Sequence, residues 1–261
     1  MKLLTVLLPN YNDLSGFIRN YDQLKTQKNY KVGTVSFLIS DDSNDNKIYE
    51  HYSEKISGDK QFSYCQGPKF GAVSNWNSCI EQVDSVYTMF LHHDEYISSE
   101  YFLSGITKIL DSNTYDLIIL PLVKDKNGRK FCHYPRLLKR IFIKFPFLLF
   151  SCNPFGSPSI IIFRNKISEG FDENLRWMVD VEWYFRFLKK RPNVLLLDNE
   201  MYEIISDLNF SETETNKMDV PKLIPIEKKY IQEKHKLKRY VFNAVWKCLR
   251  IPVKICEYFS A

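Results

Sequence analysis

The sequence lacks any pair of cysteines at the spacing of a metal site or a redox motif. Its six cysteines are scattered along the chain: Cys65, Cys79, Cys132, Cys152, Cys248 and Cys256. The absence of a C-x-x-C pair argues against a zinc site and a dithiol redox site. Isolated cysteines of this kind are typical of reduced thiols in a cytosolic protein.

Long apolar runs are also absent. No stretch reaches the roughly 18 apolar residues that a transmembrane helix needs. The short apolar run over residues 3–8 is stopped by Pro9, so it is too brief for a signal peptide and predicts a first strand instead. No internal repeat or low-complexity segment is present. We therefore expect a cytoplasmic protein, with any membrane contact peripheral.

Positive charge is scarce in the body of the protein and concentrated in its tail. The 261 residues carry a formal net charge of +5. From residue 227 to the end, nine Lys or Arg stand against three acids, a net charge of +6, which leaves −1 for residues 1–226. This near-neutral body contains no recognised nucleic-acid-binding module, so we expect no nucleic-acid partner.

The basic tail is amphipathic over residues 227–250, which predicts a helix that Pro252 ends. One interpretation is a peripheral contact of residues 227–261 with an anionic inner-membrane surface, where Lys and Arg are attracted to lipid headgroups. The alternatives are a helix that packs back on the domain and a helix that forms a dimer contact.

Strand and helix patterns alternate through the first half of the chain. Apolar runs predict strands over residues 3–8, 35–39, 61–65, 86–91 and 116–123, and helical spacing predicts helices over 15–28, 46–56 and 98–110 and after Gly71. This alternation implies crossover connections and a mainly parallel sheet. We predict an α/β domain over residues 1–220 and a helical extension over 221–261.

The second half is less regular. Residues 125–129 predict a hairpin turn, and short strands are predicted over 159–163 and 194–197. Residues 136–150 are basic and very apolar, and they fit core, a substrate lid or a membrane-facing segment. A helix is predicted over 177–190, where Asp180 lies on the flank of the apolar face and Glu182 points away from it as a surface acid.

Polar side chains follow three of the predicted strands. Pro9-Asn10-Tyr11-Asn12 ends the first strand, Asp41-Asp42-Ser43 the second, and His92-His93-Asp94-Glu95 the strand over 86–91. In open α/β sheets, ligands bind at the carboxyl ends of the strands. The acidic pair in the last motif is therefore a candidate metal and phosphate site, and its alternative interpretation is a solvated turn.

These motifs, taken in order, resemble the inverting glycosyltransferases of family 2, in particular those of bacterial surface-polysaccharide synthesis. The resemblance covers about residues 1–200 and rests on Tyr11-Asn12, Asp41-Asp42-x-Ser, the acids after the strand over 86–91, and Asp180 followed six residues later by Arg186. It implies a GT-A fold, a Rossmann-like nucleotide-binding domain with a mainly parallel sheet flanked by helices.

The resemblance also implies roles for individual residues. The positions that match nucleotide-sugar-binding residues are Pro9, Asn10, Tyr11, Asp42, Asn75 and His93. Asp94, Glu95 and His92 match the metal-binding D-x-D motif, with His92 in place of its first acid, and the cofactor expected is Mn²⁺ or Mg²⁺. Asp180 matches the general base. The alternatives are an Asx-turn or a helix cap for Asp42 and a packing role for Tyr11. For Asp180 they are an N-cap or a structural ion pair with Arg176 or Arg186.

The function implied is metal-dependent, inverting transfer of a sugar from a nucleotide-sugar, most simply a UDP-sugar, to a glycan or lipid-linked glycan acceptor, as in O-antigen or capsule synthesis. Residues 153–158, which precede a predicted strand, fit an acceptor-side loop or an ordinary loop. His92 leaves open a degenerate, non-catalytic binding subunit. A sugar-nucleotide pyrophosphorylase is the third alternative, although it should carry a glycine-rich basic loop after the first strand.

Overall fold

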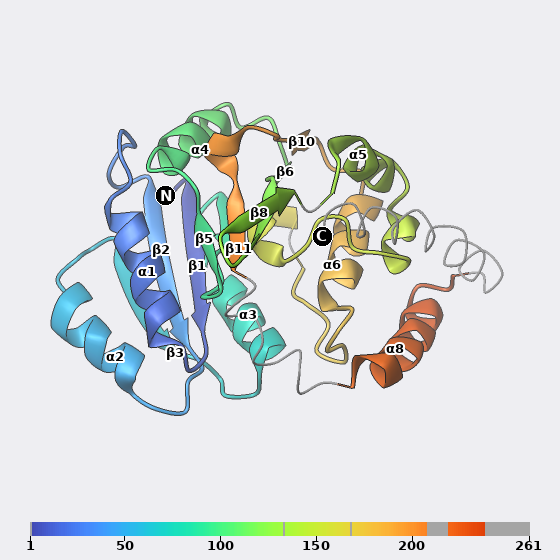
Figure 1. Cartoon of the computed structure of the whole chain (residues 1–261), viewed down its shortest axis with the longest axis horizontal. Helices are drawn as coiled ribbons and strands as arrows, with labels where there is room; N and C mark the ends of the chain where they lie inside the picture. Colours follow the sequence, from blue (N-terminus) through green and yellow to red (C-terminus); the bar gives the residue numbers. More distant parts are fainter. Residues whose placement is uncertain (1, 133, 168, 208–218, 238–261) are drawn as a thin grey trace.

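A large, mainly parallel sheet forms the centre of the molecule (Figure 1). The computed structural model describes residues 2–132, 134–167, 169–207 and 219–237. Within them the sheet has the strand order β10-β6-β9-β4-β1-β2-β3, and β9 alone runs antiparallel to its neighbours β4 and β6. The strands are β1 (Leu4–Asn10), β2 (Val35–Asp41), β3 (Phe62–Gln66), β4 (Tyr87–Phe90), β6 (Leu117–Ile119), β9 (Ile161–Arg164) and β10 (Val194–Leu196).

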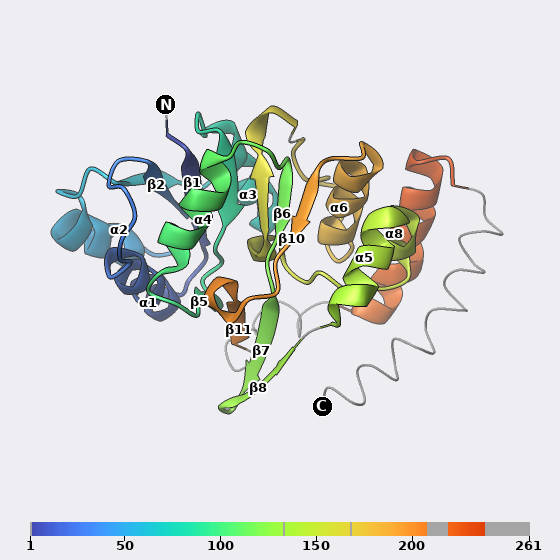
Figure 2. The ribbon, with the colours of Figure 1, turned by 90° about the horizontal axis from the view of Figure 1, so that it is seen from above.

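Helices cover both faces of this sheet. The helices of the described residues are α1 (Leu14–Lys25), α2 (Lys47–His51), α3 (Ala72–Glu81), α4 (Phe102–Asp111), α5 (Arg136–Lys144), α6 (Val179–Lys189) and α8 (Val220–Lys234). Of these, α8 packs on α6 and lies away from the sheet (Figure 2). The chain moves outward from β1 to β3 and then returns to β4 on the other side of β1. Right-handed crossovers therefore place α1 and α2 on one face and α3 on the opposite face, as the view from above shows (Figure 2).

Short helical turns connect these elements. A π-helical turn, η1 (Tyr52–Ile56), extends α2, and four 3₁₀ turns follow later in the chain: η2 (Pro146–Phe150), η3 (Pro158–Ile160), η4 (Asn165–Ile167) and η5 (Glu200–Tyr202). The segment 136–150, for which three interpretations were open, forms α5 and η2. Phe142, Leu149 and Phe150 are buried in it, whereas Leu137 and Ile141 are exposed.

A second, smaller sheet has the order β5-β11-β7-β8. Its strands are β5 (Glu95–Ile97), β7 (Leu122–Lys126), β8 (Arg129–Cys132) and β11 (Ile204–Asp207). The predicted hairpin turn joins β7 to β8 and is confirmed. The prediction of one strand over residues 116–123 was wrong, because the chain changes sheets at Pro121: β6 belongs to the large sheet and β7 to the small one. β5 and β11 were not predicted.

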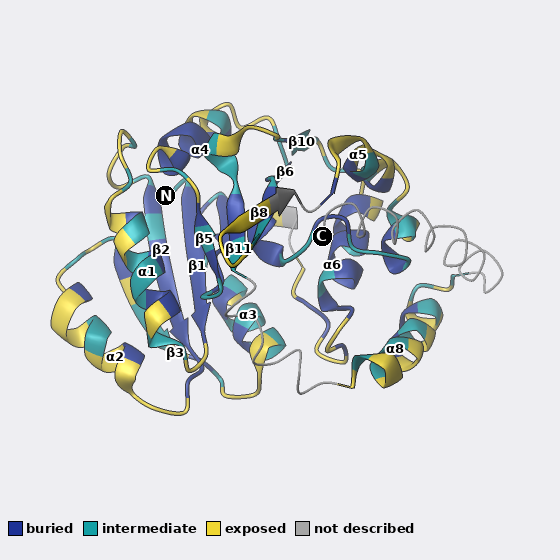
Figure 3. Cartoon of the chain, in the orientation of Figure 1, coloured by how far each residue is buried: buried dark blue, intermediate teal, exposed yellow. Residues whose placement is uncertain are grey.

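Burial explains why the large sheet is stable. Every residue of β1 is buried, as expected for a central strand covered on both faces (Figure 3). Under α6, the indole of Trp183 stacks on Phe171 with 4.6 Å between ring centroids and meets Phe163 edge-on at 5.1 Å. Because these aromatic rings join α6 to β9, the position of α6 relative to the sheet is fixed by the core.

None of the helices in the described part of the chain combines the length and the apolar character of a membrane-spanning helix. The helix predicted over residues 227–250 begins earlier in the structure, at Val220, and ends at Lys234. Residues 238–261, which carry the rest of that prediction, lie outside the described residues.

Candidate active site

The loops after β1 and β2 are joined by backbone and side-chain hydrogen bonds. The amide N–H of Asn12 donates to Ser43 Oγ at 2.8 Å, and the N–H of Asn44 donates to Asn12 Oδ1 at 2.9 Å. Asn12 adopts a φ of 53°, a left-handed conformation that asparagine tolerates better than most residues. The two strand ends therefore form one connected edge.

The three residues predicted after β1 occupy different environments. Pro9 is buried in the strand. The Asn10 side chain is also buried and donates from Nδ2 to the carbonyl oxygen of Leu8 at 2.7 Å, so it bonds its own strand. Tyr11 is exposed, and its hydroxyl accepts a hydrogen bond of 3.2 Å from Asn44 Nδ2. Of the three side chains, that of Tyr11 is presented at the surface.

Asp42 is buried beside the turn that follows β3. Its Oδ1 accepts the amide N–H of Lys69 at 2.5 Å. Burial raises the pKa of Asp42, although the backbone N–H groups of Lys69 and Gly71 oppose that shift. Gly67 lies directly against this carboxylate, since a Cβ there would come within 2.7 Å of Asp42 Oδ1. The turn thus depends on a residue without a side chain.

Asn75, from α3, lies beneath the same turn. Its Oδ1 accepts a hydrogen bond of 2.5 Å from the hydroxyl of Ser40, and a Cβ on Gly67 would come within 3.0 Å of that Oδ1. Asn75 is buried. The structure therefore brings Asp42 and Asn75 together around Gly67, with Asn75 as a support behind the turn.

The turn after β4 brings His92, Asp94 and Glu95 together. One potential ligand atom from each residue lies within 4.8 Å of the other two. His92 Nδ1 is 3.3 Å from Glu95 Oε2 and 3.2 Å from the hydroxyl of Ser159, and Ser157 donates a hydrogen bond to Glu95 Oε1. His92 and Glu95 are buried and Asp94 is half-buried.

Electrostatics in this turn follow from burial and proximity. Burial opposes ionisation of Glu95, yet hydrogen bonds from His92 and Ser157 keep its pKa below the ordinary value. The pKa of Asp94 is raised by burial and by the neighbouring charge of Glu95. Burial lowers the pKa of His92, but the hydrogen bond and charge of Glu95 outweigh it, and the net shift is upward. The turn therefore favours an additional positive charge.

Asp180 lies in the first turn of α6, and its carboxylate interacts electrostatically with His92 and Glu95. Burial raises its pKa to about 7, the imidazole of His92 opposes that shift, and the charge of Glu95 adds to it. No hydrogen bond or ion pair to the Asp180 carboxylate occurs among the described residues. Asp180 therefore lies close enough to the His92–Glu95 turn for the charges of that turn to change its pKa.

Helix α1 holds the backbone of the turn, which the sequence did not reveal. Arg19 Nη2 donates to the carbonyl oxygen of His93 at 2.6 Å, and Asn20 Nδ2 donates to that of His92 at 2.8 Å. Gly16 permits the close approach, because a Cβ there would lie 2.3 Å from the His93 oxygen. His93 therefore contacts α1 through its backbone.

Comparison with known proteins decides the family. The chain matches the model of Glycosyl transferase family 2 over residues 5–171, more than half of its length. The chain belongs to glycosyl transferase family 2. This confirms the resemblance inferred from the strand-end motifs, and it sets aside the pyrophosphorylase alternative. No curated protein matches the chain.

Solved structures share the fold of this family 2 member. TarS 1–349 from S. aureus in complex with UDP-GlcNAc aligns with a TM-score of 0.68 and 19% identity, covering 94% of this chain and 70% of that chain. The mannosyltransferase PcManGT from Pyrobaculum calidifontis in complex with GDP-Man and Mn²⁺ aligns with a TM-score of 0.54 and 13% identity, covering 77% and 56%. The predicted GT-A fold is confirmed.

The chain spans only part of the length of these neighbours. It spans 39% of the longer TarS structure, with a TM-score of 0.60 and 21% identity over 87% of this chain. In another TarS 1–349 structure the aligned region covers 60% of that chain. Because identity is low throughout, the likeness concerns the fold.

In this family 2 chain, α8 packs against α6 through buried charges, and one expectation about α6 was wrong. Glu182 was predicted to be a surface acid, but it is 0% exposed. Its carboxylate accepts hydrogen bonds from Arg186, from Lys234 Nζ at 2.7 Å and from His235 Nε2 at 2.9 Å. Burial opposes ionisation of Glu182, and these partners keep its pKa below the ordinary value. The face opposite the core is covered by α8.

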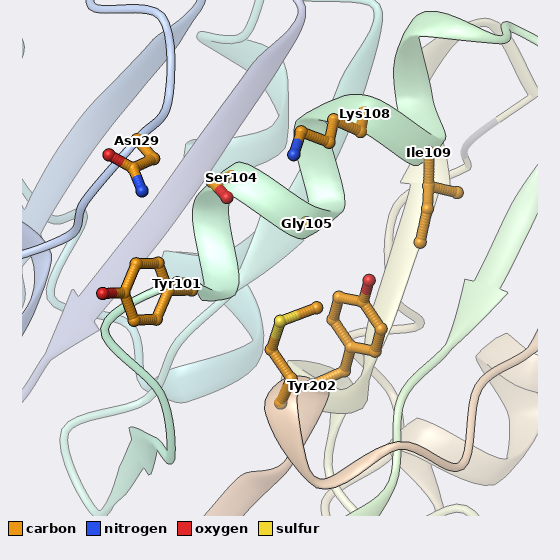
Figure 4. A pocket seen from close by; sticks show the side chains of 8 residues that line it. Asn29, Tyr101, Ser104, Gly105, Lys108, Ile109 and Tyr202 are labelled. Carbon is orange, nitrogen blue, oxygen red and sulfur yellow. The ribbon is translucent and has the colours of Figure 1, made fainter.

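A cavity of about 520 Å³ lies elsewhere in the molecule, between α4 and η5 (Figure 4). Tyr101, Lys108 and Tyr202 line it together with Asn29. Asn29 precedes β2, so the cavity opens near the amino ends of the strands, away from the edge that carries Asp42 and the His92–Glu95 turn. It is separate from the candidate site of the family 2 fold.

Proposed function

We propose that the protein transfers a sugar from a nucleotide-sugar to an acceptor hydroxyl, with inversion at the anomeric carbon. The observation that supports this proposal is that the Asp180 carboxylate interacts electrostatically with the His92-Asp94-Glu95 cluster, at the carboxyl edge of the sheet. Such a site combines one carboxylate that can accept a proton with a group of side chains that can bind a divalent cation. The cation would balance the charge of the diphosphate that leaves. Two-component sites of this kind suit group transfer from an activated donor.

The proposed donor site runs along the loops after β1, β2 and β3. Tyr11 would pack against the base or ribose from its exposed position, and Asp42 would accept hydrogen bonds from the nucleoside. Pro9, Asn10 and Asn75 are proposed to shape this site from behind, because their side chains are buried. Support comes from TarS, whose structures contain UDP-GlcNAc and UDP, and a UDP-sugar is accordingly our first choice of donor.

The proposed cofactor is Mn²⁺ or Mg²⁺, bound by Asp94, Glu95 and His92. Two polar atoms at this place fit such a role. His92 Nε2 is buried and has no hydrogen-bond partner among the described residues, and Glu95 Oε2 is buried with only the 3.3 Å contact to His92 Nδ1. Carboxylate oxygens suit both ions, whereas an imidazole nitrogen favours Mn²⁺. When bound, the ion would neutralise charge on the departing diphosphate. His93 is proposed to contribute near the diphosphate.

Asp180 is the proposed general base. A base is most effective when its pKa lies near the working pH, and burial raises the pKa of Asp180 to about 7. An acceptor hydroxyl placed against this carboxylate would lose its proton to Asp180 while its oxygen bonds to the anomeric carbon. The bond from that carbon to the diphosphate breaks at the same time, and the nucleoside diphosphate leaves.

The proposed acceptor is a glycan or a lipid-linked glycan, of the O-antigen or capsule type. The loop before β9 is proposed to line the acceptor side, because Ser157 and Ser159 from this loop contact Glu95 and His92. We keep the division into a domain over 1–220 and an extension over 221–261 as a proposal, although Glu227 and Ile231 of α8 are buried against the rest of the chain. The proposed peripheral membrane contact of the tail concerns residues 227–261, of which 238–261 lie outside the described residues.

The test is a screen of UDP- and GDP-sugars for Mn²⁺-dependent binding and nucleotide release. We expect one donor to bind and to be consumed, and Asp94→Asn to weaken its metal-dependent binding. Asp111→Asn, an exposed acid on α4, is the matched control and should behave as the wild type. Asp180→Asn should bind donor normally but transfer sugar about 10²–10⁴-fold more slowly. Binding without turnover of any donor would instead favour a non-catalytic binding subunit.

A further inference from the structure

The segment formed by α5 and η2 exposes apolar side chains that a soluble surface usually buries. Leu137 is 70% exposed, Ile141 41%, Phe145 43% and Phe147 37%. Phe145 and Phe147 lie together, with their ring centroids 6.3 Å apart. Contiguous exposed apolar side chains of this kind mark an interaction surface.

Helical geometry gathers these residues on one face. Leu137, Arg140, Ile141 and Lys144 follow the i, i+3, i+4, i+7 spacing that places side chains on one side of a helix, and all four are exposed. Phe142, on the opposite side, is fully buried. The exposed side of α5 can be followed in Figure 3. Apolar and basic residues therefore alternate along one outward surface, which we call the α5 face: Leu137, Arg140, Ile141, Lys144, Phe145 and Phe147.

The segment that carries this face is basic, although Asp198, from another part of the chain, pairs with Arg136 at the start of α5. Residues 126–168 contain nine Lys or Arg and no Asp or Glu. On the α5 face, Arg140 and Lys144 are exposed, and Lys144 Nζ lies 5.6 Å from the centroid of the Phe145 ring. A second copy of this chain would bring the same positive charge to the contact, so self-association through the face would be repelled. An anionic partner would instead be attracted to Arg140 and Lys144.

We propose that the α5 face binds the surface of a membrane containing anionic phospholipids. Basic residues interleaved with Leu, Ile and Phe are the pattern of a helix that lies in the plane of the interface, with its apolar side chains at the boundary between headgroups and acyl chains. Arg140 and Lys144 then interact with lipid phosphates. This surface lies outside the tail and uses residues that the proposed transfer reaction does not.

The position of the face relative to the candidate site gives the contact a consequence. Phe150 of η2 packs on Phe185 of α6, with ring centroids 4.8 Å apart, and α6 also carries Asp180. Seven residues beyond Phe150 the chain reaches Ser157, which bonds Glu95. A protein docked through the α5 face would hold the acceptor side of its site close to the lipid surface. Only this last step, the location of the acceptor side, rests on the proposed function; the membrane contact itself does not.

The experiment measures binding of the full chain to vesicles of phosphatidylglycerol and phosphatidylcholine in equal parts, by co-sedimentation, beside vesicles of phosphatidylcholine alone. We expect binding to the anionic vesicles that weakens as salt is added. The double variant Arg140→Gln/Lys144→Gln should bind about 25-fold more weakly, because each basic residue near an anionic surface contributes about fivefold. Ile141→Ser/Phe145→Ser should also weaken binding, but without reducing its salt dependence.

The matched control removes equal charge at the opposite end of the molecule. Lys55→Gln/Lys60→Gln changes two exposed lysines near α2, which lies far from α5 in Figure 1, and should bind as the wild type. If both double variants at the α5 face bind vesicles as the wild type does, the proposal is overturned. Concentration-dependent self-association that is lost in Ile141→Ser/Phe145→Ser, without vesicle binding, would assign the face to a protein contact instead. Donor consumption in vesicle-free buffer reports on the proposed function separately.

Discussion

Glu227 of α8 should be essential for the stability of α6, although it lies 47 residues beyond Asp180. Glu227 is 4% exposed, and its carboxylate accepts the amide N–H groups of Arg176 at 2.7 Å, Trp177 at 3.1 Å and Met178 at 2.7 Å. Met178 is the N-cap of α6, and Arg176 and Trp177 directly precede it, so Glu227 holds the segment that leads into the helix and satisfies an N–H group for which the helix provides no acceptor. Glu227→Ala would leave all three without their partner.

The magnitude follows from these three bonds. An unsatisfied buried donor costs about 1–3 kcal/mol, and the negative charge at a helix N-terminus contributes roughly a further 0.3–1 kcal/mol. Water can enter the space that the side chain vacates, so the lower value applies to each N–H group. We expect Glu227→Ala to reduce the free energy of unfolding by about 3 kcal/mol, which lowers Tm by about 6–12 °C in a chain of this size.

Denaturant and thermal unfolding measure this effect, with Glu233→Ala as the matched control. Glu233 is an exposed acid on the same helix, and its removal should change the free energy of unfolding by no more than about 0.5 kcal/mol. Because Asp180 lies in the first turn of α6, Glu227→Gln should slow sugar transfer more than it weakens donor binding. Equal stability of the Glu227→Ala and Glu233→Ala variants would refute the reasoning.

Three further outcomes can be measured. Sugar transfer should rise as pH increases through about 7, because Asp180 must lose its proton before it can accept one, and pH-rate profiles should lose this limb in Asp180→Asn. Gly67→Ala should weaken donor binding in calorimetric titrations, because the new Cβ displaces the Asp42 carboxylate. The fold lowers the pKa values of Glu182 and Asp172. Their ionised forms therefore stabilise the protein fully above the ordinary carboxyl pKa range, and this stabilisation is lost as pH falls below about 4. Tm measured against pH should drop less steeply in this range for Glu182→Gln.

Local sequence patterns were sufficient to predict most of the large sheet and the residues at its carboxyl edge. The apolar run before Pro9 and the run before His92 are long enough to predict β1 and β4, and the polar residues after them mark the strand ends. The short strands β5 and β11 were missed because three or four residues carry too little periodicity. Pro121 divides β6 from β7, and no local pattern distinguishes that division from one longer strand.

The contacts that hold the site together could not be predicted, because they join segments far apart in the sequence. Arg19 and Asn20 of α1 bond the backbone of the turn after β4, more than 70 residues later. Ser157 bonds Glu95 across 62 residues, and Glu227 bonds Met178 at the start of α6 across 49 residues. Their residue types are ordinary for a helix or a loop, so nothing in their neighbourhood in the sequence indicates a supporting role.

Two acids on α6 show how the fold assigns different roles to similar residues. Asp180 and Glu182 are two positions apart, so their side chains leave the helix in very different directions. Glu182 points to α8, where Arg186, Lys234 and His235 keep its pKa low, and it therefore remains an ion with partners. Asp180 points to the turn after β4, where burial and Glu95 raise its pKa. The helical pattern alone selected Asp180 but took Glu182 for a surface acid, because it treats the apolar face as the only buried one. The docking of α8 makes Glu182 structural, and it leaves Asp180 as the acid of this pair that is suited to accept a proton.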